Sequence, residues 1–232
     1  MTTDEHDTQK NLLPALARVA RGTSILFWGL PIAMVVSVMA TLSNWTAAAW
    51  PIGMLLPLVA FAMLWIGLWL LGSFQPQERV WQAALGQAKL LGLCSLGLSP
   101  FLHWHHRAPD ELYFDDTVGL LKLVFVFYMM ALNKMLARLA AMLPDETLRV
   151  ESQLFSRMNR VLLAMASLGI GVMHLVPRID ETPELLFRLV AVADQFRPWL
   201  FMAFVLIPVS MTMSLLWKTK ESILASVFTP RQ

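Results

Sequence analysis

Residues 22–77 read GTSILFWGLPIAMVVSVMATLSNWTAAAWPIGMLLPLVAFAMLWIGLWLLGSFQPQ, a stretch without a single Asp, Glu, Lys or Arg. One helical crossing of a lipid bilayer needs about 20 apolar residues. Two such helices and a tight hairpin therefore fit into this one stretch. The sequence predicts a pair of membrane-spanning helices here, and it places the chain among membrane proteins.

The composition of the whole chain agrees with this class. Of the 232 residues, 57% are hydrophobic and 15% are charged, whereas soluble domains carry about 25% charged residues. Cys94 is the only cysteine. A disulfide framework within the chain, a C-x-x-C redox pair and a C-x-x-C-H haem attachment are therefore excluded.

Further apolar segments extend the pattern to six predicted spans. We expect a single transmembrane domain at 24–217, a cytoplasmic juxtamembrane segment at 1–23 and a cytoplasmic tail at 218–232. The spans are predicted at 24–43, 51–72, 85–104, 117–141, 160–177 and 198–217, each long enough to cross at about 1.5 Å per residue. The expected fold is an all-α, polytopic bundle of membrane helices. A re-entrant hairpin formed by the third and fourth segments is the alternative.

The basic residues predict the orientation of the bundle, because cytoplasmic loops of membrane proteins gather Lys and Arg. With both termini cytoplasmic, the basic residues outside are few, namely Arg107, Lys122, Arg178, Arg188 and Arg197. The cytoplasmic set is larger and comprises Lys10, Arg18, Arg21, Arg79, Lys89, Lys134, Arg138, Arg149, Arg157, Arg160, Lys218, Lys220 and Arg231. We expect an integral protein of a bacterial-type cytoplasmic (inner) membrane.

Three segments outside the spans have helical patterns of their own. Residues 10–21 carry an apolar stripe beside Arg18 and Arg21, as in a segment that lies on anionic lipid or in a solvated lead-in to the first span. Residues 178–197 contain a predicted short helix on the outer surface. The connector at 142–159 is expected on the cytoplasmic side, as a helix along the surface.

Residues 99–116, SPFLHWHHRAPDELYFDD, contain the best candidate ligands of the chain. The predicted topology brings His174, from the fifth span, to the same outer face. Imidazoles with neighbouring carboxylates, here including Asp115 and Asp116, are a ligand set that transition metals accept. The predicted metal ligands are His103, His105, His106, His174, Asp110 and Glu111.

Two other interpretations of these histidines stay open. A haem b held by His174 and either His103 or His106 requires these residues on facing helices. Histidines, tryptophans and acidic residues are also what a helix end in the headgroup layer ordinarily contains. His-Trp-His-His lacks the fixed spacing of a motif such as H-E-x-x-H.

Several function classes receive no support from the sequence. It contains no G-x-S-x-G nucleophile motif, no P-loop and no dinucleotide fingerprint. No Asp or Glu lies inside a predicted span, which argues against proton-coupled transport through a buried carboxylate. A net charge of +2, with basic residues explained by membrane orientation, gives no indication of nucleic-acid binding.

Three function hypotheses remain. The first is a non-enzymatic subunit or scaffold in the lipid bilayer, packing against other membrane-protein subunits or against itself. The second is a membrane subunit that binds haem or a transition metal through outer-face histidines. The third is a channel or transporter for a small solute along a path that includes Asn133, although that amide is expected to bond a neighbouring helix.

Overall fold

The computed structural model describes residues 3–42, 51–108, 110–176, 188, 191–192, 195–196, 199–200 and 202–228; side chains are described except at 3–13, 41–42, 202 and 226–228. Every regular element in this part of the chain is a helix, which confirms the all-α class. Five helical segments are long and apolar enough to span a membrane: Pro14–Ala40, Ile52–Ser73, Arg79–Arg107, Leu112–Met142 and Glu146–Leu175. The molecule therefore has the helices of an integral membrane protein.

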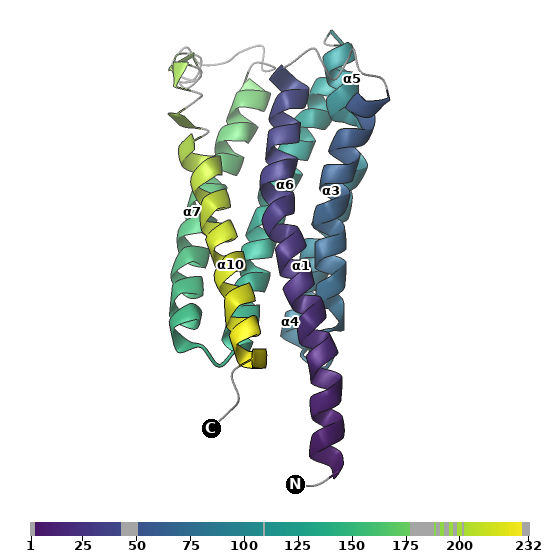
Figure 1. Cartoon of the computed structure of the whole chain (residues 1–232). Coiled ribbons are helices and arrows are strands. Elements are labelled where there is room, and N and C mark those ends of the chain that lie inside the picture. The colour runs from purple at the N-terminus through teal and green to yellow at the C-terminus, as the bar shows by residue number, and fades with distance from the viewer. Residues whose placement is uncertain are drawn as a thin grey trace.

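The long helices stand side by side and close into a ring (Figure 1). In chain order the ring consists of α1 (Thr3–Leu42), α3 (Ile52–Leu70), α4 (Arg79–Leu98), α6 (Leu112–Met142), α7 (Glu146–Leu175) and α10 (Ile207–Phe228). Each helix packs on the next, and α10 packs on α1. Three short elements extend the long ones: η1 (Leu71–Ser73) after α3, α5 (Phe101–Arg107) after α4, and the π-helix η3 (Met202–Leu206) before α10. The start of α1 and the end of α10 lie at the same end of the bundle (Figure 1).

The helices differ widely in how much of their surface the bundle covers. In its most apolar window, α6 has 50% of its residues buried, whereas α7 has only 17%. α6 contacts α4, α5, α7 and α10 and contributes Tyr128, Met129 and Leu132 to the centre of the core. α7 therefore presents most of its apolar surface outwards.

Glycines allow α1 and α3 to approach closely. A Cβ built on Gly22 would lie 2.8 Å from the carbonyl oxygen of Gly67, and a Cβ on Gly67 would lie 2.8 Å from Cγ of Leu26. A Cβ built on Gly29, two helical turns along α1, would lie 2.9 Å from Cδ2 of Leu64. Small residues at such positions let membrane helices gain van der Waals contact that side chains would prevent.

The first helix is longer than the first predicted span, because the predicted surface segment at 10–21 is part of it. α1 runs without interruption from Thr3 to Leu42. Leu16 and Val19 of the predicted apolar stripe are 8% and 0% exposed. This part of the stripe therefore packs into the bundle and does not lie on a lipid surface.

The helix that contains the fifth predicted span begins well before the span itself. α7 starts at Glu146, where the Asp145 carboxylate accepts a hydrogen bond from the backbone N–H of Leu148 at 3.0 Å. Most of the predicted connector at 142–159 is thus the first half of this helix, and it buries Leu148, Ser152, Ser156 and Asn159. The predicted connector helix is therefore continuous with the helix of the fifth span, and Arg160 lies exposed where the two meet.

The remaining boundaries also differ from the predicted ones. α10 extends to Phe228, into the predicted tail, and Lys218 on it pairs with Glu151 of α7. The third segment is divided into α4 and α5 near Pro100, yet Arg79–Arg107 and Leu112–Met142, at 29 and 31 residues, are both long enough to cross. The short helix predicted at 178–197 lies largely outside the described residues.

Candidate functional site

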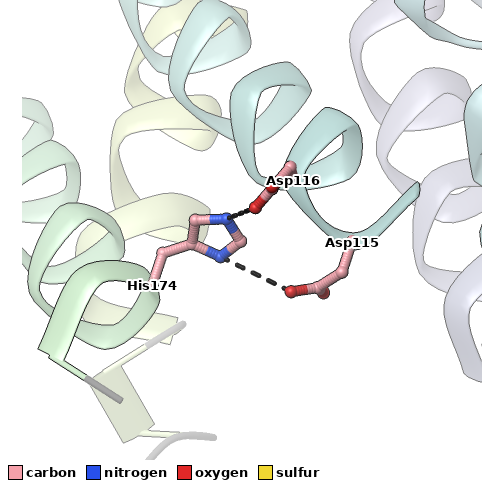
Figure 2. Close-up of side chains that lie close together, drawn as sticks. All are labelled: Asp115, Asp116 and His174. Carbon is pink, nitrogen blue, oxygen red and sulfur yellow. Dashed lines mark hydrogen bonds and ion pairs between the residues drawn. The ribbon is translucent and has the colours of Figure 1, made fainter. Parts of the chain in front are cut away.

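A cluster of one histidine and two aspartates lies where α6 begins and α7 ends (Figure 2). Nε2 of His174 lies 3.0 Å from Oδ1 of Asp116, and Nδ1 lies 3.8 Å from Oδ2 of Asp115. Both ring nitrogens therefore face a carboxylate. The imidazole side chain is 26% exposed and the carboxylates are 46% and 48% exposed, so water and ions reach the cluster.

The antiparallel pairing of α6 and α7 places Asp116 and His174 at the same height along the bundle. A short turn after Met142 joins the two helices, and nearly the same number of residues separates Asp116 and His174 from that turn. Each charge also suits its helix, because Asp115 lies in the first turn of α6 and His174 in the last turn of α7. The helix dipole favours an anion at the first position and a cation at the second.

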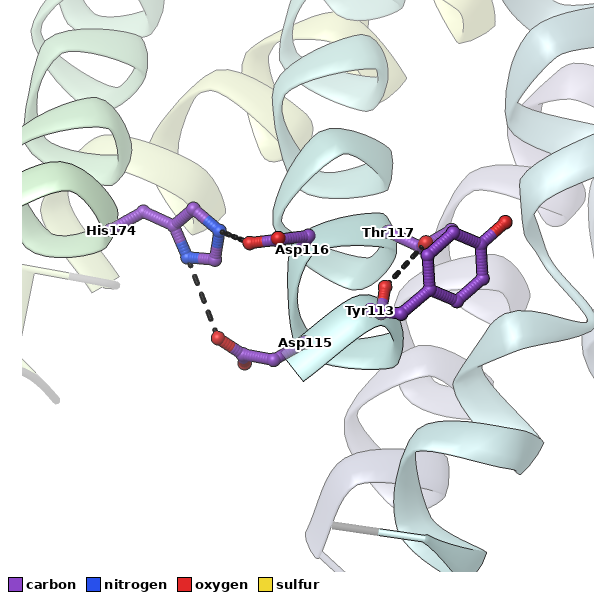
Figure 3. A network of polar contacts seen from close by, with 5 residues as sticks. All are labelled: Tyr113, Asp115, Asp116, Thr117 and His174. Carbon is purple, nitrogen blue, oxygen red and sulfur yellow. Dashed lines mark hydrogen bonds and ion pairs between the residues drawn. The ribbon is translucent and has the colours of Figure 1, made fainter. Parts of the chain in front are cut away.

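Gly119 makes the space that the imidazole occupies. A Cβ built on Gly119 would lie 2.8 Å from both Cε1 and Nε2 of His174, a distance that requires the ring or the helix to move. On the side of α6 turned away from His174, Thr117 donates to the Tyr113 carbonyl at 2.7 Å (Figure 3). Tyr113 and Thr117 therefore hold the first turn of α6 without joining the cluster.

The three side chains are close enough together that they could hold a metal ion. One ligand atom from each of the three side chains lies within 4.8 Å of the others, and two ligands of a tetrahedral zinc ion lie roughly 3.3 Å apart, given bonds of about 2.0 Å. Only one nitrogen of an imidazole binds a given metal, so the other would bond to the second carboxylate. A carboxylate that orients a ligating histidine is the usual outer partner at zinc sites.

Of the six predicted metal ligands, only His174 belongs to this cluster. His103 is buried in α5 with its ring edge-on to Trp104 at 5.8 Å, and His105 and His106 follow on the same short helix. Asp110 and Glu111 are exposed just before α6. Among the described residues, convergent groups of three His, Cys, Asp or Glu side chains reduce to Asp115, Asp116 and His174.

The haem hypothesis required His174 and an α5 histidine on facing helices. α5 packs against α1, α3 and α6, while His174 belongs to α7, which packs against α6 and α10. Metal ligation by His103, His105 or His106 stays a prediction that no contact in the described part of the chain tests.

A second polar cluster lies in the apolar core, between α6, α7 and α10. Nδ2 of Asn133 donates to the Met129 carbonyl at 2.8 Å and to Oγ1 of Thr212 at 2.9 Å. Asn159 donates to Oδ1 of Asn133 at 3.0 Å, and Thr212 donates to the Pro208 carbonyl at 2.7 Å. All three polar side chains are at most 1% exposed.

These contacts confirm that Asn133 bonds neighbouring helices, as expected from the sequence. Both N–H bonds of its amide are used by protein acceptors, so a solute would have to displace a helix contact to reach it. Asn159 and Thr212 were not predicted. Asn159 lay just outside the predicted fifth span, and an earlier start at the Asp145 cap would have included it.

The chain matches no known family model, and no curated protein or solved structure shows significant similarity to it.

Proposed function

We propose that this chain is a non-enzymatic subunit of a membrane-protein assembly, and that a transmembrane helix of another polypeptide packs against α7. The bundle crosses the membrane six times in this proposal and has both termini in the cytoplasm. The observation that carries the proposal is the outward face of α7. This helix has 17% of its apolar window buried, against 33% to 50% in the other candidate spans.

Seven exposed apolar residues of α7 form a heptad seam, from Leu154 to Leu175. They alternate in steps of four and three positions along the helix, and each is between 36% and 70% exposed: Leu154, Met158, Val161, Met165, Leu168, Val172 and Leu175. A seam with a period of 3.5 residues is what a second helix needs for continuous knobs-into-holes packing at a small crossing angle.

Small residues beside the seam support close approach. A Cβ on Gly169 or Gly171 would meet no atom within 4 Å, so both glycines are open towards the outside of the bundle. Inside the bundle, glycines instead serve the contact between α1 and α3. Helix association in membranes is driven by van der Waals packing at small residues, and α7 offers such residues on a face that no described helix covers.

Site-specific photo-crosslinking in native membranes tests this proposal. A benzoylphenylalanine at position 168 on the seam is expected to give discrete protein adducts of higher mass. The matched control is position 90 on α4, because Leu90 and Leu168 are both highly exposed, at 62% and 70%. Equal adduct yields at 168 and 90, or none at 168, would contradict a helix partner on α7. Adducts between two differently tagged copies would identify the partner as a second copy.

The six-span topology has its own support and its own test. The start of α1 and the end of α10 lie at the same end of the bundle (Figure 1), as an even number of crossings requires. Single cysteines at positions 108 and 182, in a Cys94→Ser background, are to be labelled with a membrane-impermeant thiol reagent in intact cells. We expect both to react. Reaction at 182 without reaction at 108 would favour the re-entrant hairpin.

A second candidate function is binding of a divalent transition metal at the outer end of α6 and α7. The convergence of His174 with Asp115 and Asp116 favours it. Zn²⁺ titration of the purified protein by calorimetry is expected to show one site. His174→Ala and Asp116→Asn should each weaken binding by about tenfold or more. Wild-type affinity in both variants would exclude the cluster as the zinc site.

A further inference from the structure

A small basic pocket lies where α1, the end of α3 and α4 meet, far along the chain from the histidine cluster. Its volume is about 290 Å³, and it is lined by Arg18, Trp69, Leu70, Gly72, Ser73 and Lys89. The lining combines two cations, a hydroxyl and an indole, and it contains no carboxylate. An anion is the ligand that these groups suit.

Lys89 folds back over the end of α3. A Cβ built on Gly72 would lie 2.6 Å from Nζ of Lys89, so the absence of a side chain at Gly72 lets the ammonium group rest there. Lys89 is half-buried, whereas Arg18 is exposed on the facing surface of α1. The two cations therefore approach one pocket from different helices.

The charges of Arg18 and Lys89 are not compensated within the described part of the chain. No described carboxylate lies within ion-pair distance of either residue; the ion pairs found there involve Arg149, His174 and Lys218. Glu78, the acidic residue closest in sequence to the pocket, uses its carboxylate to cap α4 through the Trp81 N–H at 3.0 Å. Cations at membrane depth pair with an anion or reach the headgroup layer.

The position of the pocket along the bundle matches the headgroup layer. Gly22 contacts Gly67 and Leu71 across the α1–α3 interface, and Arg18 lies about one helical turn before Gly22. Arg18 is therefore level with the end of α3, where the charge-free stretch of the chain ends. Trp69 is 64% exposed at this level, as tryptophans are at membrane interfaces.

We infer that this pocket binds the phosphate of an anionic phospholipid such as phosphatidylglycerol, with Arg18 and Lys89 as the cationic partners and Ser73 as a hydroxyl donor. Basic pockets between transmembrane helices are suited to lipid headgroups. A lipid is favoured over free phosphate because exposed apolar side chains continue beside the pocket. Trp69 and Leu90, at 64% and 62% exposed, offer a surface for the acyl chains.

Native mass spectrometry of the full chain in detergent, titrated with phosphatidylglycerol, tests the inference. Arg18→Gln and Lys89→Gln should each raise the Kd by about fivefold, since one basic residue near a membrane surface contributes about 1 kcal/mol. Lys89→Arg should retain binding because the charge is kept. The matched control is Arg79→Gln, which removes an exposed cation outside the pocket and should leave the Kd unchanged.

Two further arms identify the source of the phosphate. Phosphatidylcholine, whose anionic phosphodiester is compensated by the choline cation, should bind more weakly than phosphatidylglycerol, and inorganic phosphate alone should not displace the lipid at equal concentration. Displacement by inorganic phosphate would overturn the lipid assignment. A Kd that is the same in Arg18→Gln, Arg79→Gln and the wild type would overturn the pocket itself. Arg18 is exposed, so this variant is informative even if Lys89→Gln does not fold.

Discussion

Asn159 on α7 donates a hydrogen bond to Oδ1 of Asn133 on α6 at 3.0 Å, and both side chains are at most 1% exposed. Asn159 also lies 3.3 Å from the Pro208 carbonyl, at the point where the π-helix η3 passes into α10. Proline has no N–H, and a π-turn shifts the register of helical bonding. The two asparagines thus stabilise the helix that has the least regular backbone in the described bundle.

Removal of this cluster should destabilise the bundle by a measurable amount. Asn159→Ala and Thr212→Val are each expected to lower the free energy of unfolding by about 1 kcal/mol, the usual scale for interhelical hydrogen bonds in membranes. Thr23→Val is the matched control, since the described hydrogen bonds of buried Thr23 go to carbonyls of its own helix, at 3.0 Å. Unfolding in mixed detergent micelles measures all three variants.

The coupling within the cluster is a separate expectation from its total contribution. In a double-mutant cycle, Asn133→Ala and Asn159→Ala should be non-additive by about 0.6 kcal/mol. Strict additivity, or a loss in Thr23→Val as large as in Thr212→Val, would show that the cluster contributes no more than a buried polar group on a single helix.

The contact between α1 and α3 should be intolerant of a single methyl group. Gly22→Ala places Cβ against the Gly67 carbonyl, a backbone atom that cannot rotate away, so the helices must separate. Overpacking of this kind costs about 1 to 3 kcal/mol. Gly97→Ala is the control, because its Cβ meets no atom within 4 Å, and alanine favours the helix there. Thermal unfolding that ranks Gly97→Ala below Gly22→Ala would contradict the close approach.

Sequence patterns predicted the all-α class and the end of the bundle at which each segment lies. Both properties depend on hydropathy and charge. His174 and the residues at 99–116 were placed at one face by counting spans, and the structure brings His174 to Asp115 and Asp116 at that face. The choice of carboxylates was not predictable in this way. It depends on the rotation of α6 against α7 and on the space beside Gly119, which are properties of packing.

α7 and α10 extend beyond the predicted spans for a common physical reason. Charges were taken as the ends of spans, but Arg157 and Arg160 lie exposed on α7, and Lys218 lies on α10 in a pair with Glu151. Long basic side chains extend past a helix surface without ending the helix. The Asp145 cap marks the real start of α7 and could have been read from the sequence.

Tyr128 should tolerate the loss of its hydroxyl group. The side chain is 0% exposed, and its hydroxyl oxygen has no hydrogen-bond partner among the described residues. A buried polar group without a partner costs free energy, so Tyr128→Phe should be neutral or stabilising by about 1 kcal/mol. The ring stays stacked on Phe125 at 5.8 Å in either case. A loss of stability in Tyr128→Phe would reveal a hydroxyl partner that the described contacts do not contain.

Gly119→Ala tests whether zinc binding depends on the position of the imidazole. The new Cβ would lie 2.8 Å from Nε2 of His174, so the ring must leave its place between Asp115 and Asp116, although all three ligands remain in the chain. Zinc affinity, measured by calorimetry, should fall about tenfold, as it does when a group that orients a metal ligand is lost. Gly97→Ala should bind zinc as the wild type does. If Gly119→Ala retains full affinity while His174→Ala loses it, the imidazole binds zinc from a different position, and the present arrangement of the cluster is not the metal-bound one.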